Sequence, residues 1–177
     1  MDLLDFEQAE MYFDEPVSEE VEHLVAMAAA NYGNEDAELM LLRANFIAPH
    51  HLMVLVALYR YYFYQHRLED ALLVAESTMA VVGRRLNFPE TWRNLREDNV
   101  GEGVMQSMGL VRFYMMILKA AGYIHLRMGQ FSIGKAMLEK LIELDSHDRF
   151  GGKALLDVLH QSMVNETNAE GKPKWTN

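Results

Sequence analysis

A repeated spacing of small and large apolar residues constrains the fold of this chain more than any other feature of its sequence. The first copy of the pattern consists of Ala37, Leu41, Ala44 and Pro49. The positions 34 residues further along hold Ala71, Ala75, Thr78 and Gly83. The opening alanine returns, whereas the later positions are kept only in part. Because a fixed period of about 20 to 50 residues is typical of stacked supersecondary units, we expect an array of similar units.

Helical periodicity accompanies this repeat, and strict alternation of apolar and polar residues is nearly absent, so we predict an all-α fold. Turn residues separate predicted helices at residues 18–31, 35–48, 50–65, 68–84, 103–128, 131–144 and 150–164, with a short helix after Pro89. Antiparallel pairs are expected to meet at residues 32–34, 65–67 and 129–130. We expect Leu39, Leu42 and Phe46 to mark the buried side of the second helix.

A third copy of the pattern is displaced along the chain. Gly134 lies 63 residues after Ala71, which is one period plus 29 residues. The excess corresponds to about residues 86–114, which we interpret as an insertion or as a degenerate half-unit. Gly122 and Gly134 are predicted to allow two helix backbones to approach closely, since glycine has no Cβ.

The copies together resemble the tetratricopeptide repeat over about residues 18–146. In that family the second helix of a unit opens with a small residue, followed by large apolar, small and proline positions at the spacing seen here. The resemblance implies a superhelix of about three antiparallel helix-hairpin units, with residues 150–164 as a capping helix. The alternative interpretation is a plain helical bundle in which the 34-residue spacing is accidental. In being short, acidic and three-unit with an N-terminal extension, the chain also resembles the tetratricopeptide chaperones of bacterial type III secretion.

Three segments differ in composition: an acidic N-terminal extension at residues 1–17, the helical domain at 18–165, and a polar tail at 166–177 that we expect to be mobile. Twelve acidic residues precede Arg43, the first lysine or arginine. The extension reads either as a solvated acidic tail or as a docking arm for a basic surface. Because it also carries apolar residues, we predict that residues 1–16 are either disordered or docked on another chain, which offers a route to a homodimer.

Charge and composition exclude several classes of function. The formal net charge of −10 argues against general nucleic-acid binding, which needs a basic field. The chain has no cysteine, begins with acidic residues and contains no apolar run of about 18 residues, so we expect a cytoplasmic protein without membrane insertion. No pair of histidines has metal-ligand spacing, and no nucleotide or nucleophile motif appears. We therefore expect no metal, no cofactor and no enzymatic activity.

In the tetratricopeptide family the first helices of successive units line a concave face. The resemblance places the following residues there as partner-binding candidates: Met53, Val56, Arg60, Phe63, Tyr64, Lys119, Tyr123, Leu126 and Arg127. Aromatic residues and arginine carry much of the energy of protein interfaces. For each residue the competing reading is packing against the inserted segment or simple solvation.

We therefore predict an adaptor or chaperone that holds a segment of a partner protein in a concave helical groove, with Arg60, Lys119 and Tyr123 sharing that groove. The alternative is a regulatory or sensor module that binds a small ligand there. A third hypothesis, a helical enzyme, would require a buried cluster of carboxylates and histidines with shifted pKa values.

Overall fold

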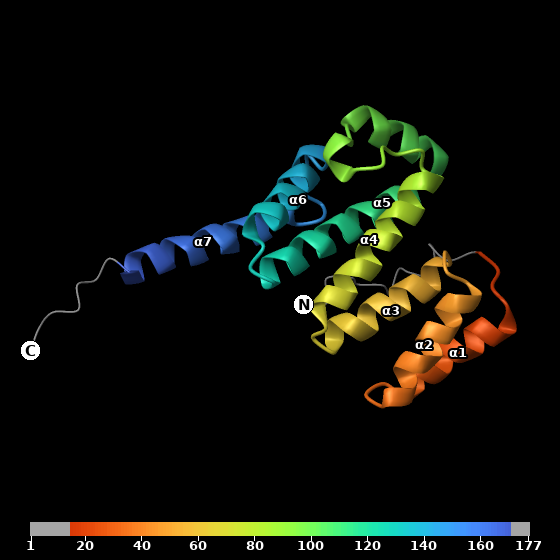
Figure 1. Cartoon of the computed structure of the whole chain (residues 1–177). Coiled ribbons are helices and arrows are strands. Elements are labelled where there is room, and N and C mark those ends of the chain that lie inside the picture. The colour runs from red at the N-terminus through yellow and green to blue at the C-terminus, as the bar shows by residue number, and fades with distance from the viewer. Residues whose placement is uncertain (1–14, 171–177) are drawn as a thin grey trace, which may run out of the picture.

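The computed structural model describes residues 15–170, and in this range the chain contains seven α-helices and no strand (Figure 1). The elements in order are α1 (Glu19–Ala30), α2 (Glu35–Ile47), α3 (Leu52–Tyr64), α4 (Leu68–Arg85), the 3-10 helix η2 (Trp92–Asn94), α5 (Glu97–Arg127), α6 (Phe131–Leu144) and α7 (Gly152–Glu170). The all-α prediction and the three predicted turns are confirmed.

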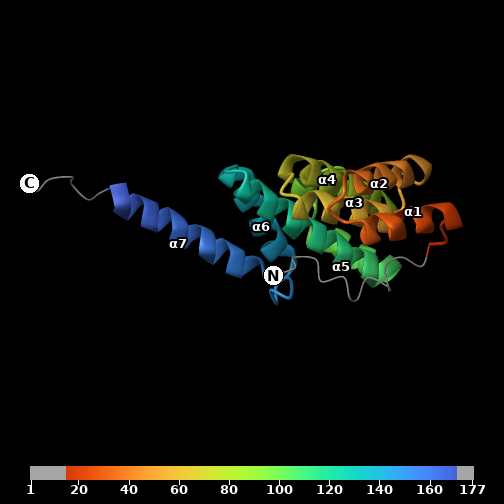
Figure 2. The same cartoon turned by 90° about the horizontal axis from the view of Figure 1, so that it is seen from below.

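Helices that follow one another along the chain pack against one another. The pairs α1–α2, α3–α4 and α5–α6 form hairpins, and α2–α3, α4–α5 and α6–α7 join them into a row. Figure 2 shows α2 and α4 on one side of the molecule and α1 and α5 on the other, while α7 leads away from the body. This arrangement is compatible with a helical repeat fold.

The repeated positions form the core of each hairpin. The first three positions of each copy are buried: Ala37, Leu41 and Ala44 on α2, Ala71, Ala75 and Thr78 on α4, and Gly134, Leu138 and Leu141 on α6. The small side chains of Ala37 and Ala44, at the first and third positions of the repeat pattern, let α2 approach its neighbouring helices closely. The periodic pattern therefore identifies the inward side of every second helix.

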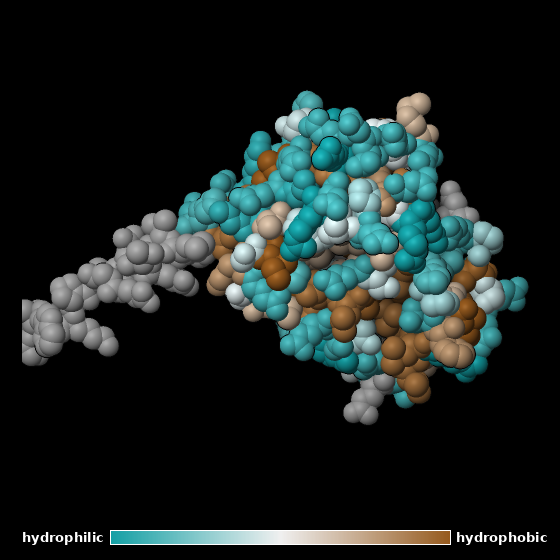
Figure 3. Space-filling model, turned by 45° about the horizontal axis from the view of Figure 1, so that its top comes forward, coloured by the Kyte–Doolittle hydropathy of each residue, from teal (hydrophilic) through white to brown (hydrophobic). Residues whose placement is uncertain are grey.

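The same contacts correct one prediction about α2. Leu39, Leu42 and Phe46 are 68%, 44% and 88% exposed, so the expectation that they mark the buried side is wrong. The helix buries its small-residue side instead, because closeness of backbones rather than side-chain size decides how α2 packs. In Figure 3, hydrophobic surface gathers at the lower right, over the part of the molecule that contains α2.

Two glycines set the distance between α5 and α6, as predicted. A Cβ on Gly134 would lie 2.7 Å from the carbonyl oxygen of Gly122 and 2.7 Å from a methyl carbon of Leu126. A Cβ on Gly122 would lie 3.2 Å from the Cβ of Met137. The two backbones are therefore closer than any larger residue at position 134 would allow.

Residues 86–114 begin with a loop and end inside α5. The short helix predicted after Pro89 is only the 3-10 turn η2, and α5 starts at Glu97 rather than at the predicted 103. At Ser107 the backbone leaves the helical region (φ −160°, ψ 103°), and its Oγ accepts a hydrogen bond of 3.2 Å from the Leu110 amide. Ser107 therefore begins a second helical section within α5.

The described range touches both predicted end segments only in part. Helix α7 continues to Glu170, beyond the predicted start of the tail at 166, because residues 153–170 contain no glycine or proline. The predictions of a mobile end at 171–177 and of disorder or docking on another chain at 1–14 lie outside the described residues, as does the homodimer expected from that segment.

Candidate functional site

A groove between α1 and α3 forms an open hollow on the surface of the described residues. Its volume is about 750 Å³. It is lined by Val25, Ala28, Ala29 and Tyr32 beside α1, by Leu41 of α2, and by Met53, Val56, Ala57, Arg60, Tyr61 and Tyr64 of α3. Alanines at three of these positions leave the space between the two helices open. The lining is apolar and aromatic, and it carries one arginine among the described residues.

Aromatic rings continue from this groove across α3 to α5. Tyr32 meets Tyr61 edge to face, with ring centres 5.9 Å apart. Further along, Phe63 contacts Tyr64 at 5.7 Å and Tyr123 at 6.3 Å. Since rings of this kind are rigid and offer large contact areas, the row suits recognition of apolar side chains.

Four of the predicted partner-binding residues line the groove itself: Met53, Val56, Arg60 and Tyr64. Arg60 is exposed, and Tyr64, which is one helical turn further along α3, is 44% exposed. Both therefore present their side chains at the rim, where a bound segment would meet a positive charge and an aromatic ring.

Three further predicted residues adjoin the groove through ring contacts. Phe63 bridges α3 to Tyr123 on α5. The Arg127 guanidinium donates a hydrogen bond of 3.2 Å to the Tyr123 hydroxyl and lies 5.8 Å from the centre of that ring. The structure thus continues the aromatic and basic surface from Arg60 towards Arg127.

The last two predicted residues, Lys119 and Leu126, lie elsewhere and are not among the groove-lining residues. The Lys119 amine lies 3.6 Å from the place of a Cβ on Gly151, at the turn before α7. Burial lowers the pKa of Lys119, and the nearby carboxylate of Asp148 opposes that shift. Leu126 packs against Gly134 and the small cluster that α6 and α7 form.

Sequence reasoning missed several groove residues on α1 and α3. The sequence predicts Tyr32 only as part of the turn at residues 32–34, and nothing in the repeat pattern indicates Tyr61. The signal was present in the spacing of Val25, Ala28, Ala29 and Tyr32, which recur at three- and four-residue steps on one helix face. The spacing therefore predicts that these four residues share one face of the helix.

A polar cluster ties α2 to the turn between α3 and α4. The Tyr62 hydroxyl donates a hydrogen bond of 3.1 Å to Glu38, and Arg67 forms ion pairs of 2.6 Å with Glu38 and 2.8 Å with Asp70. Burial and the charge of Glu38 raise the pKa of Tyr62 to about 12. All polar groups here have partners within the cluster, so its role is to hold the second helix pair against the first.

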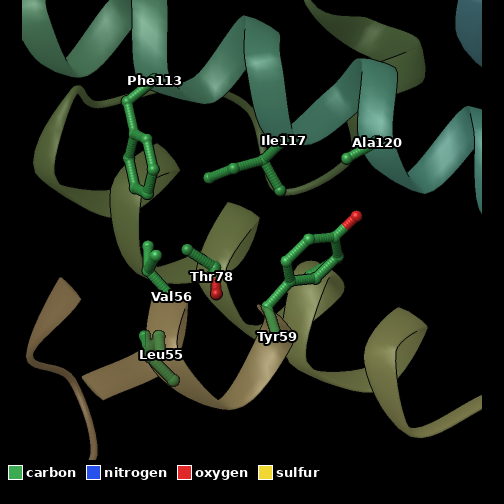
Figure 4. A pocket seen from close by; sticks show the side chains of 8 residues that line it. Leu55, Val56, Tyr59, Thr78, Phe113, Ile117 and Ala120 are labelled. Atoms are coloured by element: carbon green, nitrogen blue, oxygen red, sulfur yellow. The ribbon is translucent and has the colours of Figure 1, made fainter. Parts of the chain in front are cut away.

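The core also contains a small cavity between α3, α4 and α5, of about 10 Å³ (Figure 4). Its walls are buried side chains, including Val56, Phe113 and Ile117, and the Thr78 hydroxyl donates to the carbonyl of Val74. Such a volume is about enough for one water molecule and is therefore no ligand site.

Within residues 15–170, no group of three histidines or carboxylates could hold a metal ion. None of the helices in this range is both long enough and apolar enough to cross a membrane. The groove between α1 and α3 has an apolar, aromatic lining and one arginine, which suit a binding site.

Comparison with known proteins relates the chain to a bacterial protein. No protein-family model matches the chain, and no solved structure matches it. A protein of Azotobacter chroococcum mcd 1, "Uncharacterized 19.8 kDa protein in nifW 5'region", is 46% identical to the chain over 179 residues. The match covers 98% of this chain and 100% of the relative. At this identity and coverage, the chain belongs to the same family as that 19.8 kDa protein.

Proposed function

We propose that the chain is a protein-protein interaction module of the tetratricopeptide type, an adaptor or chaperone that holds a segment of a partner protein in the groove between α1 and α3. The observation that carries this proposal is the groove itself, which has a volume of about 750 Å³ and an apolar, aromatic lining with Arg60 at its rim. The burial of the three repeat copies supports the tetratricopeptide assignment, because that family packs its second helices through these positions.

The groove favours an extended segment with alternating apolar and acidic residues. Its apolar floor accepts side chains such as leucine or phenylalanine, and the guanidinium of Arg60 offers a charge-assisted hydrogen bond to a carboxylate. The exposed rings of Tyr32 and Tyr64 mark the far end of the groove and leave it open to solvent. An open end allows a partner chain to enter and leave without complete enclosure.

The relative suggests where a partner should be sought. Its name places its gene in the 5' region of nifW, and proteins encoded close together often act together. The product of nifW is therefore the first candidate to test against the full chain, by calorimetry with purified proteins, followed by products of other neighbouring genes.

Two pairs of variants separate the groove from the rest of the surface. Ala29→Trp fills the groove and should abolish measurable binding, whereas Ala80→Trp, on the exposed side of α4, should leave it unchanged. Arg60→Ala should weaken binding by about 10-fold to 150-fold, the equivalent of a lost charge-assisted contact of about 1.5 to 3 kcal/mol. Arg84→Ala, at an exposed site, should weaken it by less than about 5-fold. Normal binding by both groove variants would refute the proposal.

A second candidate function is binding of a small ligand in the same groove. Its volume of about 750 Å³ lies within the range of about 300 to 1,000 Å³ usual for small-molecule sites. A heat-stable small molecule that copurifies with the parent chain, and not with Ala29→Trp, would favour this candidate.

A further inference from the structure

The segment that precedes the described residues has the chemistry that the groove accepts. Residues 1–14 contain the apolar residues Leu3, Leu4, Phe6, Met11, Tyr12 and Phe13. They also contain five carboxylates, at Asp2, Asp5, Glu7, Glu10 and Asp14, and no lysine or arginine. The groove offers an apolar, aromatic lining, with Arg60 at its rim and Arg127 further along the same surface. The composition and charge of this segment are therefore complementary to the lining of the groove.

The chain enters the described structure at the mouth of the groove. Both carboxylate oxygens of Glu15 accept hydrogen bonds from Arg85, at 2.6 and 3.1 Å, and Arg85 also donates to the His50 carbonyl at 2.9 Å. A ring nitrogen of His51 lies 3.0 Å from the Glu15 carbonyl oxygen. His51 is the N-cap of α3, and Met53 begins the α3 side of the groove two residues later. Glu15 is thus held at one end of this groove.

The length of the segment is sufficient to fill it. From Met53 to Tyr64 the groove follows twelve residues of α3, and the eleven steps of 1.5 Å between them add up to about 16 Å. The 14 residues before Glu15 span about 21 Å as a helix and about 46 Å when extended. The segment can therefore pass from Glu15 along the whole groove in either conformation.

We propose that residues 1–14 occupy the groove between α1 and α3 of their own chain, as an internal ligand that a partner must displace. Occupancy of the groove by residues 1–14 is argued from the lining of the groove and from the position of Glu15 at its end. Displacement of the segment by a partner rests on the proposed function. Tethering gives the segment an effective concentration of the order of millimolar, so even a weak intrinsic affinity keeps it bound. A partner then binds more weakly than its contacts alone would allow, because only chains with an empty groove can bind it.

The absence of native cysteine makes a direct test possible in the full chain. One variant carries Ala9→Cys and Ala57→Cys, which joins the segment to the groove. A matched control carries Ala9→Cys and Ala80→Cys, which joins it to the exposed side of α4. Ala80 lies five residues before Arg85 on α4, so it is also within reach of a segment that starts at Glu15. Disulfide formation is followed under mild oxidation at low protein concentration, by electrophoresis without reductant.

Occupancy of the groove predicts an intrachain disulfide that forms at least about 10-fold faster at Ala57→Cys than at Ala80→Cys, with the preference lost in urea. Similar rates at both positions would show that the segment has no preferred site and would overturn the proposal. Dimers linked through Ala57→Cys would also overturn it, because they place the segment in the groove of a second copy.

A third variant separates this inference from the proposed function. In the full chain, Phe6→Ser with Phe13→Ser removes two apolar anchors and should abolish the crosslinking preference. It should also strengthen binding of the partner protein by about 10-fold, if that partner uses the same groove. One outcome is a clear preference for crosslinking at Ala57→Cys together with partner binding that Ala29→Trp leaves unchanged. This outcome would support the internal ligand and refute the proposed function. The opposite outcome is partner binding that Ala29→Trp abolishes, without any crosslinking preference. That outcome would support the proposed function and refute the internal ligand.

Discussion

Replacing Gly134 by alanine tests whether the close approach of α5 and α6 holds the third helix pair together. The added methyl group would sit 2.7 Å from the Gly122 carbonyl oxygen and 2.7 to 2.8 Å from two carbons of Leu126. Ordinary contacts of these atoms begin near about 3.4 Å, so the two helices must separate by about 0.6 Å. The backbone oxygen cannot move without its helix, and the Leu126 side chain is itself packed.

The cost follows from this separation. Overpacking of a close interface typically destabilises by about 1 to 3 kcal/mol, and a gap of this size weakens the neighbouring contacts of Leu138 and Leu141. Alanine returns about 0.5 to 1 kcal/mol, because it is a better helix former than glycine. We expect a net loss of about 2 kcal/mol, which for a chain of this size lowers Tm by about 4 to 8 °C.

Two other glycines serve as graded controls in urea and thermal unfolding followed by circular dichroism. Gly122→Ala meets its nearest neighbours at 3.2 to 3.3 Å and should cost less than Gly134→Ala. Gly101→Ala, in the first section of α5, has no atom within 4 Å and should stabilise by about 0.5 kcal/mol. If Gly134→Ala were as stable as Gly101→Ala, the glycine contact between α5 and α6 would have no part in stability.

Two further predictions concern stability at other sites. Burial raises the pKa of Tyr114 to about 12, so the folded state holds this proton more tightly than the unfolded chain. Its contribution is complete below about pH 10 and is lost as the pH rises towards 12, so Tyr114→Phe should flatten the decline of urea midpoints above pH 10. Phe46→Gln, at an 88% exposed site, should change the free energy of unfolding by less than about 0.5 kcal/mol, whereas Leu41→Ala, on the buried side of the same helix, should cost about 2 to 4 kcal/mol. Equal effects of these two variants would contradict the observed orientation of α2.

Most of the fold was accessible from the sequence because its signals are local or periodic. Turn residues located the hairpins, and the spacing of Ala37 and Ala71 identified the buried side of each second helix. The same spacing also predicts the orientation of α2, with Ala37 on the buried side. The hydrophobicity of Leu39 and Phe46 predicts the opposite orientation, which is wrong. A periodic pattern of small residues reports on backbone distance, whereas the hydrophobicity of one side chain reports only on its own transfer free energy.

The candidate site was predictable only in part, because it depends on which helices face one another. The register of the second unit placed Arg60 and Tyr64 correctly on the side of α3 that lines a groove. The 34-residue step does not extend to the third unit, because residues 86–114 add a loop and a break in α5 at Ser107 before it. Lys119 consequently lies beside the turn before α7, a relation that no spacing within one helix could show.

The distribution of charge connects the groove to the rest of the chain. Twelve acidic residues precede the first arginine, and three of them form ion pairs with arginines of the helical body: Glu15 with Arg85, Glu20 with Arg43, and Glu38 with Arg67. Several carboxylates of the acidic N-terminal region therefore have arginines of the helical body as partners. Arg60 is the charged residue in the lining of the groove, and carboxylates come before Glu15 at intervals of two to four residues. An acidic extension placed at the mouth of an apolar groove with a basic rim is consistent with a ligand tethered to its site, and a solubilising tail alone would not need large apolar residues such as Leu3, Phe6 and Phe13.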